Sequence, residues 1–200
     1  NKLQRDGHAR YVLESRREDI ASGAIEALFS SRLSGVNVEY GVSFDAYNMH
    51  RYQVLEGLLG ARYVNNIDYF LVDDATYSNN LRNNLRDPNI IVKEGDTFGY
   101  NYSLSLLRTS LFGRAYWRYR DVDISLKANL ASYRYIREGY YEKELYPGSG
   151  SYGRGRSIAL SPYRVGGVVG YTTGNHLFCA SVDIEGCVPE VDDLFYNLDY

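Results

Sequence analysis

The sequence lacks any long uninterrupted apolar stretch, because polar or charged residues break every run before the ~18 residues that a membrane-spanning helix needs. It also lacks a strong charge of either sign, with 22 basic against 25 acidic residues and a net charge of -3. No overall basic field is therefore present to attract nucleic acid or anionic lipid. The chain starts at Asn1 without an initiator methionine or a signal peptide, so we expect a mature chain or a piece of a longer one.

Recognisable catalytic and metal-binding patterns are also missing. The sequence contains neither G-x-S-x-G nor H-E-x-x-H, and His8, His50 and His176 lie too far apart for ligand spacing. Asp73, Asp74 and Asp96 could bind calcium or act as acid/base groups, but acidic residues in polar loops are usually solvated. We therefore predict no enzymatic activity and no cofactor.

Two further motifs have stronger structural explanations. The segment PGSGSYG (147–153) spells G-x-G-x-x-G, but no strand precedes it and no helix pattern follows, so a glycine-rich loop is expected. Arginines alternate with aromatic residues at 116–120 and 133–138, as in single-strand nucleic-acid binders. In alternating strands this pattern instead places Arg118 and Arg120 opposite Trp117 and Tyr119. Nucleic acid is not expected as a partner.

What the chain has in excess is tyrosine, with 21 residues, and glycine, with 19, which together favour an all-β protein with many turns. Residues 36–50 show the pattern best. Val36, Val38, Tyr40, Val42, Phe44 and Ala46 alternate with Asn37, Glu39, Gly41, Ser43 and Asp45. This is a strand much longer than the usual five or six residues, with one apolar and one polar face.

The segment 96–119 alternates in the same way, but its apolar positions change parity between Leu106 and Leu107. A β-bulge at that point would explain the change, because one extra residue moves every later side chain to the other face. The alternative is two strands joined by a turn at Ser110–Gly113.

Connections between these segments alternate in length. Ser34–Gly35, Arg120–Val122 and Thr173–Asn175 are tight turns, whereas 51–95 and 138–156 are long and polar. Short turns at one end and long loops at the other are typical of outer-membrane barrels, whose tilted strands need about 9 to 11 residues to span the bilayer. A soluble β-sandwich also has alternating strands, but it leaves the strand length and the loop asymmetry unexplained.

Three segments carry a family resemblance: LEGLLGARYVNNIDYF (55–70), EGDTFGYNYSLSL (94–106) and residues 137–176. Their order and spacing resemble the barrel of a TonB-dependent outer-membrane receptor of the Bacteroidetes type. The matching positions are Leu58, Leu59, Gly60 and Tyr63, then Gly95, Asp96, Phe98, Gly99 and Tyr100. Gly57 stands where the family usually has Asp, and Gly166 where Lys is common.

The resemblance implies a 22-stranded barrel in the bacterial outer membrane, closed by a plug, that imports a small ligand with energy passed through TonB. Residues 1–200 would then be part of one barrel domain, with about seven strands and no plug, in contact with outer-membrane lipid. Ligand capture would involve the loops 51–95 and 138–156. Two other classes remain open: a complete small outer-membrane barrel with a structural or adhesive role, and a soluble extracellular β-domain that binds glycans.

We predict consecutive antiparallel strands at 10–17, 24–33, 36–50, 96–119, 123–137, 157–172 and 175–185. Val42 and its even-numbered neighbours are expected to face lipid, and Ser43 the lumen. Cys179 and Cys187, the only cysteines, are expected to form a disulfide in an oxidising compartment. That bond requires the chain to fold back near Asp183–Gly186, because eight residues of one extended strand span roughly 26 Å.

Overall fold

The computed structural model describes residues 7–9, 11–68, 82–144, 146–189 and 194–195. Within these ranges the chain forms an antiparallel sheet with the strand order β1-β2-β5-β6-β9-β10, and two short strands, β7 and β8, pair with β6. The bounds are β1 (Leu13–Leu33), β2 (Val36–Gly57), β3 (Val64–Asn65), β4 (Ile91–Val92), β5 (Thr97–Tyr119), β6 (Val122–Gly139), β7 (Gly153–Arg154), β8 (Ile158–Leu160), β9 (Tyr163–Thr173) and β10 (His176–Gly186). The predicted all-β antiparallel architecture is confirmed.

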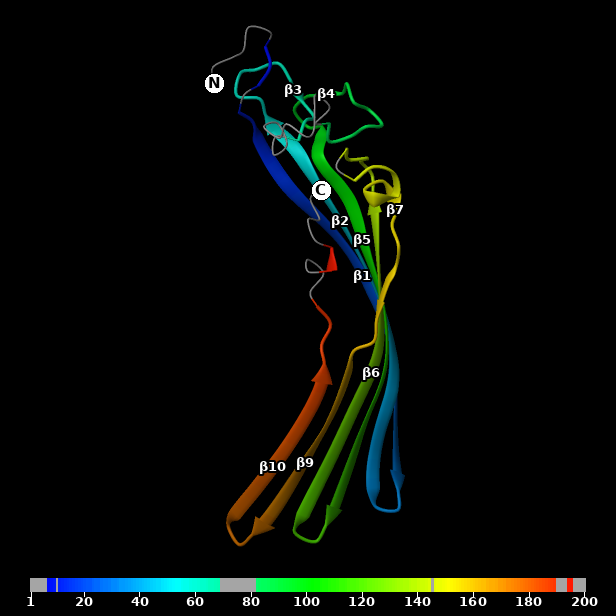
Figure 1. Cartoon of the computed structure of the whole chain (residues 1–200). Helices are drawn as coiled ribbons and strands as arrows, with labels where there is room; N and C mark the ends of the chain where they lie inside the picture. The colour runs from blue at the N-terminus through cyan, green and yellow to red at the C-terminus, as the bar shows by residue number, and fades with distance from the viewer. Residues whose placement is uncertain (1–6, 10, 69–81, 145, 190–193, 196–200) are drawn as a thin grey trace.

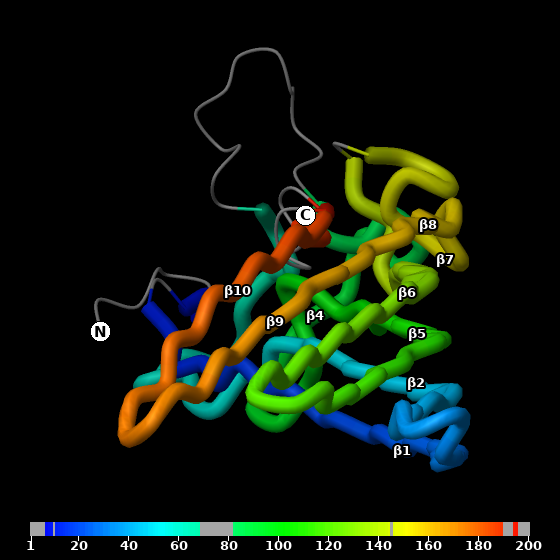
Figure 2. The backbone as a smooth tube through the Cα atoms, turned by 90° about the horizontal axis from the view of Figure 1, so that it is seen from below, coloured from blue at the N-terminus to red at the C-terminus, as the bar shows by residue number. Residues whose placement is uncertain are grey.

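Long strands joined as successive hairpins dominate the molecule, and their tight turns gather at one end while the long connections gather at the other (Figure 1). Ser34 and Gly35 have φ of 47° and 85°, as a two-residue hairpin turn with the twist of its strands requires. Arg120 and Gly174 occupy the same left-handed region at the other two turns. The three predicted tight turns are therefore present. The sheet twists and curves across its strands, with β1 and β10 as its edges (Figure 2).

The prediction of separate strands at 10–17 and 24–33 is wrong, because β1 runs unbroken from Leu13 to Leu33. Residues 18–23 carry no clear apolar alternation, but each of them pairs with a residue of β2, from Glu18 with Arg51 to Gly23 with Ala46. The hydrogen-bond ladder of a long neighbour keeps this segment extended despite its weak local pattern. By the same pairing β2 continues to Gly57, so the first long connection begins after that residue and not at 51.

The predicted bulge at Leu106–Leu107 is also wrong, and so is the alternative turn at Ser110–Gly113. β5 pairs with β2 and β6 without a register shift through both places. The irregularity lies nearer the long-loop end, where Tyr52 pairs with Asn101 and Gln53 with Phe98, which leaves Gly99 and Tyr100 as extra residues. Gly99 has φ of 70°, which a residue with a side chain rarely adopts.

The segment 157–172 forms two strands instead of one, because Ser161 and Pro162 separate β8 from β9. Proline has no N–H to give to the ladder, although the Pro162 carbonyl oxygen still accepts a hydrogen bond from Ala131 N at 3.0 Å. The glycine-rich loop at 147–153 is confirmed: it contains the three-residue 3₁₀ turn Gly148–Gly150 (η1) and leads into β7 at Gly153.

The buried core lies at the long-loop end. Ala9, Leu55, Leu58, Val64, Val92 and Phe98 form one cluster, which packs β3, β4 and the first long connection against the ends of β2 and β5. Met49, Tyr100, Tyr102 and Leu104 form a second cluster on one face of the sheet, where Tyr47 and Phe195 pack against it. Tyr102 and Leu104 are thus covered by other parts of the chain, which explains why the start of β5 carries apolar side chains on this face.

Candidate functional site

The paired strands divide their side chains between two faces. We call the face that carries Val42 the apolar face and the face that carries Ser43 the polar face. Register places Ala27, Val42, Leu111, Leu130 and Tyr163 side by side on the apolar face. Because side chains alternate along a strand, every second residue from this row belongs to the same face.

The apolar face is free of charge over the half that lies nearer the tight turns. From the row of Gly23, Ala46 and Leu107 to the tight turns, the only charged residue among its described strand positions is Arg134, in that uppermost row. Its large side chains are exposed, and they include Ile25, Phe29, Tyr40, Phe44, Leu111, Trp117, Tyr119, Leu126, Leu130, Val165, Val169, Tyr171, Phe178, Val182 and Ile184. Contiguous exposed apolar surface of this extent marks an interaction surface.

The polar face carries ion pairs between strands. They are Glu18–Arg51 at 2.6 Å, Asp45–Arg108 at 2.9 Å, Glu39–Arg114 at 3.6 Å, Arg118–Asp123 at 3.5 Å, Lys127–Asp183 at 2.8 Å, Arg164–Asp183 at 3.5 Å and Arg164–Glu185 at 3.7 Å. Tyr116 Oη also donates a hydrogen bond to Asp123 at 2.6 Å. This face therefore presents hydrogen-bonding groups of both signs with little net charge.

A glycine lets one of these pairs cross an intervening strand. Lys127 lies on β6 and Asp183 on β10, and β9 runs between them. A Cβ atom at Gly166 of β9 would lie 2.8 Å from Cε of Lys127. Only a residue without a side chain leaves room for the lysine and the carboxylate to meet there.

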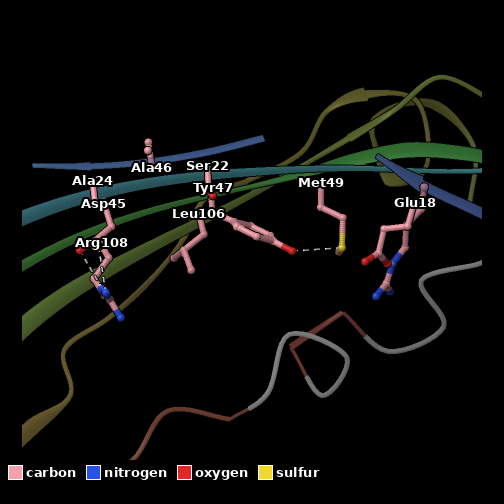
Figure 3. A pocket seen from close by; sticks show the side chains of 11 residues that line it. Glu18, Ser22, Ala24, Asp45, Ala46, Tyr47, Met49, Leu106 and Arg108 are labelled. Atoms are coloured by element: carbon pink, nitrogen blue, oxygen red, sulfur yellow. Dashed lines mark hydrogen bonds and ion pairs between the residues drawn. The ribbon is translucent and has the colours of Figure 1, made fainter. Parts of the chain in front are cut away.

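A hollow of about 570 Å³ lies on the polar face between two of the ion pairs (Figure 3). Glu18, Asp45, Arg51 and Arg108 contribute charged walls, while Tyr47, Met49 and Leu106 contribute apolar ones. Arg108 donates two hydrogen bonds to Asp45, Nε to Oδ2 and Nη2 to Oδ1, each at 2.9 Å. This fork geometry fixes both side chains at the wall of the hollow.

The long connections are anchored above this hollow by buried polar contacts. Lys143 Nζ donates to Asn83 Oδ1 and to the Gly99 carbonyl oxygen, both at 2.7 Å, which ties two connections to the bulge in β5. The Arg137 guanidinium lies 4.9 Å from the centre of the Tyr102 ring, and burial lowers its pKa. Burial likewise raises the pKa of Tyr141, whose hydroxyl donates to the Thr97 carbonyl oxygen at 2.8 Å.

The predicted disulfide is wrong in this structure. Cys179 and Cys187 are both free and exposed, because β10 stays extended to Gly186 instead of folding back near Asp183–Gly186. An extended strand holds residues eight apart roughly 26 Å from each other, far beyond bonding range.

The other residues singled out in the sequence, where the structure describes them, make local hydrogen bonds or ring contacts. Asp96 Oδ2 accepts a hydrogen bond from Lys93 N at 2.8 Å and so closes the turn before β5. His8 lies edge-on to Tyr63, and His50 Nε2 is 2.7 Å from Asn101 Oδ1. Arg120 lies 5.4 Å from the centre of the Tyr119 ring at its turn. Asp73 and Asp74 lie outside the described residues.

The ion pairs of the polar face were not identified from the sequence. Alternation indicated which charged residues share that face, but pairing Asp45 with Arg108 requires the β2–β5 register, which 63 residues of chain separation leave open. Within the described ranges no group of three His, Cys, Asp or Glu side chains could hold a metal ion, and no helix is long and apolar enough to cross a membrane. Comparison of the chain with protein-family models, curated proteins and solved structures finds no match.

Proposed function

We propose that the chain forms part of the wall of a transmembrane β-barrel in the bacterial outer membrane, and that this barrel belongs to a TonB-dependent receptor. In this proposal the apolar face meets lipid and the polar face lines the import path. The long connections at the other end from the tight turns capture the imported small ligand. The receptor class rests on the sequence resemblance, and the membrane location rests on the two faces.

The charge-free apolar face carries the proposal. Ten residue steps separate Val36 from Ala46, which corresponds to roughly 33 Å along the strand. At the tilt of about 40° that is usual for such barrels, this distance spans roughly 25 Å across the bilayer, the height of the apolar band of outer-membrane barrels. Trp117, Tyr119, Tyr171 and Phe178 lie at the lower edge of this band, where aromatic residues favour the membrane interface.

The apolar face is uncovered in the described chain, which favours contact with lipid over burial inside a soluble β-sandwich. In a sandwich a second sheet would bury the apolar side chains. Here Ile25 is 75% exposed and Leu111 58%, while the buried clusters lie at the long-loop end.

The open edges of the sheet support a larger barrel. Among the described strands β1 pairs only with β2, and β10 only with β9. Unpaired backbone N–H and C=O groups are costly in hydrocarbon, so a membrane sheet must close on itself. Further strands at both edges would complete it.

Neighbouring positions on β6 provide the test. Asn129 lies on the polar face and Leu130 on the apolar face, near the middle of the band. Each is changed to cysteine in the complete protein, with Cys179→Ser and Cys187→Ser, and the protein is reconstituted in phosphatidylcholine vesicles. A charged, water-soluble maleimide should label N129C, whereas L130C should become reactive only after denaturation.

Two controls complete this experiment. Vesicle flotation checks that both variants enter the bilayer, and labelling in detergent-free buffer without lipid checks whether the chain is soluble. Equal labelling of the two cysteines in vesicles, or a soluble protein that does not float with lipid, would exclude the proposed membrane location.

A further inference from the structure

A second hollow of about 570 Å³ lies at the upper rim of the apolar face. Its floor consists of the small residues Ala21, Gly23 and Ala46, and Leu107 and Ile136 add apolar walls. Asn48 and Ser105 line it too, and Asn48 Nδ2 donates to Ser105 Oγ at 3.2 Å. The hollow therefore spans the level at which this face changes from apolar to polar.

Two arginines line this hollow. Arg134 is the register partner of Leu107, and Arg154 follows on β7, as the register partner of Glu138. Both side chains are exposed, and within the described parts of the chain neither forms an ion pair or a side-chain hydrogen bond. Arg108, Arg114 and Arg164 of the polar face are each paired with a carboxylate, whereas both arginines of this hollow are without one among the described residues.

We infer that this hollow binds a lipid of the surrounding leaflet through a phosphomonoester headgroup. The guanidinium groups of Arg134 and Arg154 would hold the phosphate, and an acyl chain would lie along Leu107 and Ile136. The inference rests on the proposed function, because only a membrane would bring lipid to this face. Guanidinium binds phosphate oxygens in a bidentate manner, and basic residues beside an apolar groove are a known basis of headgroup recognition.

The depth of the hollow fits this ligand. Gly23, Ala46, Leu107 and Arg134 lie in one row across four strands, directly above the charge-free part of the face. In the proposed orientation this row is at the hydrocarbon boundary, so a phosphate there would sit at headgroup level. The small floor residues leave space for a chain that larger side chains would fill.

The test uses the complete protein in phosphatidylcholine vesicles that contain a small fraction of phosphatidic acid. After extraction in neutral detergent, the phosphatidic acid that stays bound is counted by mass spectrometry. The wild type is compared with Arg134→Gln/Arg154→Gln, and with Arg32→Gln/Arg114→Gln as a control that removes the same charge from the polar face. We expect about a tenfold loss of bound phosphatidic acid in the first variant and little change in the control.

Two further measurements distinguish a lipid phosphate from free phosphate as the ligand. Diacylglycerol, the same lipid without its phosphate, should not be retained, and inorganic phosphate should not displace phosphatidic acid. Equal retention by the wild type and Arg134→Gln/Arg154→Gln, retention of diacylglycerol, or displacement by inorganic phosphate would each overturn the inference. If the proposed function itself is wrong, the wild type will not float with vesicles, whereas failure of this inference alone leaves flotation intact.

Discussion

The ring of Phe112 on β5 lies over the backbone of Gly41 on β2, its register partner on the polar face. A Cβ atom at Gly41 would be 2.6 Å from Cζ of Phe112 and 2.5 Å from the carbonyl oxygen of Ala27 on β1. An aromatic side chain that covers a glycine of the next strand fixes register where the glycine has no side chain of its own.

Gly41→Ala should therefore destabilise the protein by about 1 to 3 kcal/mol, because both the ring and the β1 backbone must shift. Gly113→Ala is the matched control, since a Cβ atom there meets only Glu39 O at 3.7 Å and Tyr40 Cβ at 3.9 Å. Urea unfolding of the complete protein in lipid vesicles measures both. A loss at Gly113 equal to that at Gly41 would contradict the close packing described for Phe112.

Asp45→Asn should lower the melting temperature, because it removes the carboxylate that accepts both hydrogen bonds from Arg108. The side chains are 25% and 43% exposed, so solvent screens the loss. Glu39→Gln, in a pair that is 3.6 Å apart and more exposed, should have an effect close to zero. Thermal unfolding of the two variants under the same conditions compares them, and a larger effect from Glu39→Gln would reverse the ranking.

Val42→Arg should cost about 2 to 4 kcal/mol if the apolar face lies in lipid, because Val42 is near the middle of the band. Ser43, the neighbour that alternation suggests as a control, is only 9% exposed and would be crowded by arginine. Asn129 is exposed on the polar face at nearly the same depth, so Asn129→Arg should cost much less. Unfolding in vesicles measures the contrast, and equal losses would mean that the two faces are wrongly assigned.

Glu56, which lies near the long-loop end, should make the folding stability of the protein depend on pH. A hydrogen bond from Ser15 Oγ at 2.6 Å and another from Arg17 Nη2 at 2.7 Å lower the pKa of this carboxyl below its ordinary value. Because the pKa of Glu56 is lowered in the folded state, its contribution to folding stability is fully present at a pH above the unfolded-state pKa. This contribution is lost as the pH falls through the folded-state pKa. Glu56→Gln should thus reduce the melting temperature at about pH 7 and leave it unchanged at about pH 2. If Glu56→Gln still lowers the melting temperature at the lower pH, the carboxylate is not the cause of the difference.

Alternation along 36–46 was sufficient to predict a long strand with two distinct faces, because a period of two can place its apolar residues on one side only. The tight turns were also readable, since Gly35 and Gly174 supply conformations that other residues avoid. From these local signals the antiparallel class follows.

Tertiary structure decided what local signals left open. Residues 18–23 are extended because β2 supplies a ladder for them, and the early part of β5 is apolar on the polar face because the second core cluster covers it. A sequence pattern reports side-chain polarity but not what covers a side chain, so the parity change at Leu106–Leu107 was mistaken for a bulge. Likewise, Asp45 meets Arg108, and Arg134 lines the same hollow as Arg154, only because register sets which residues of distant segments become neighbours.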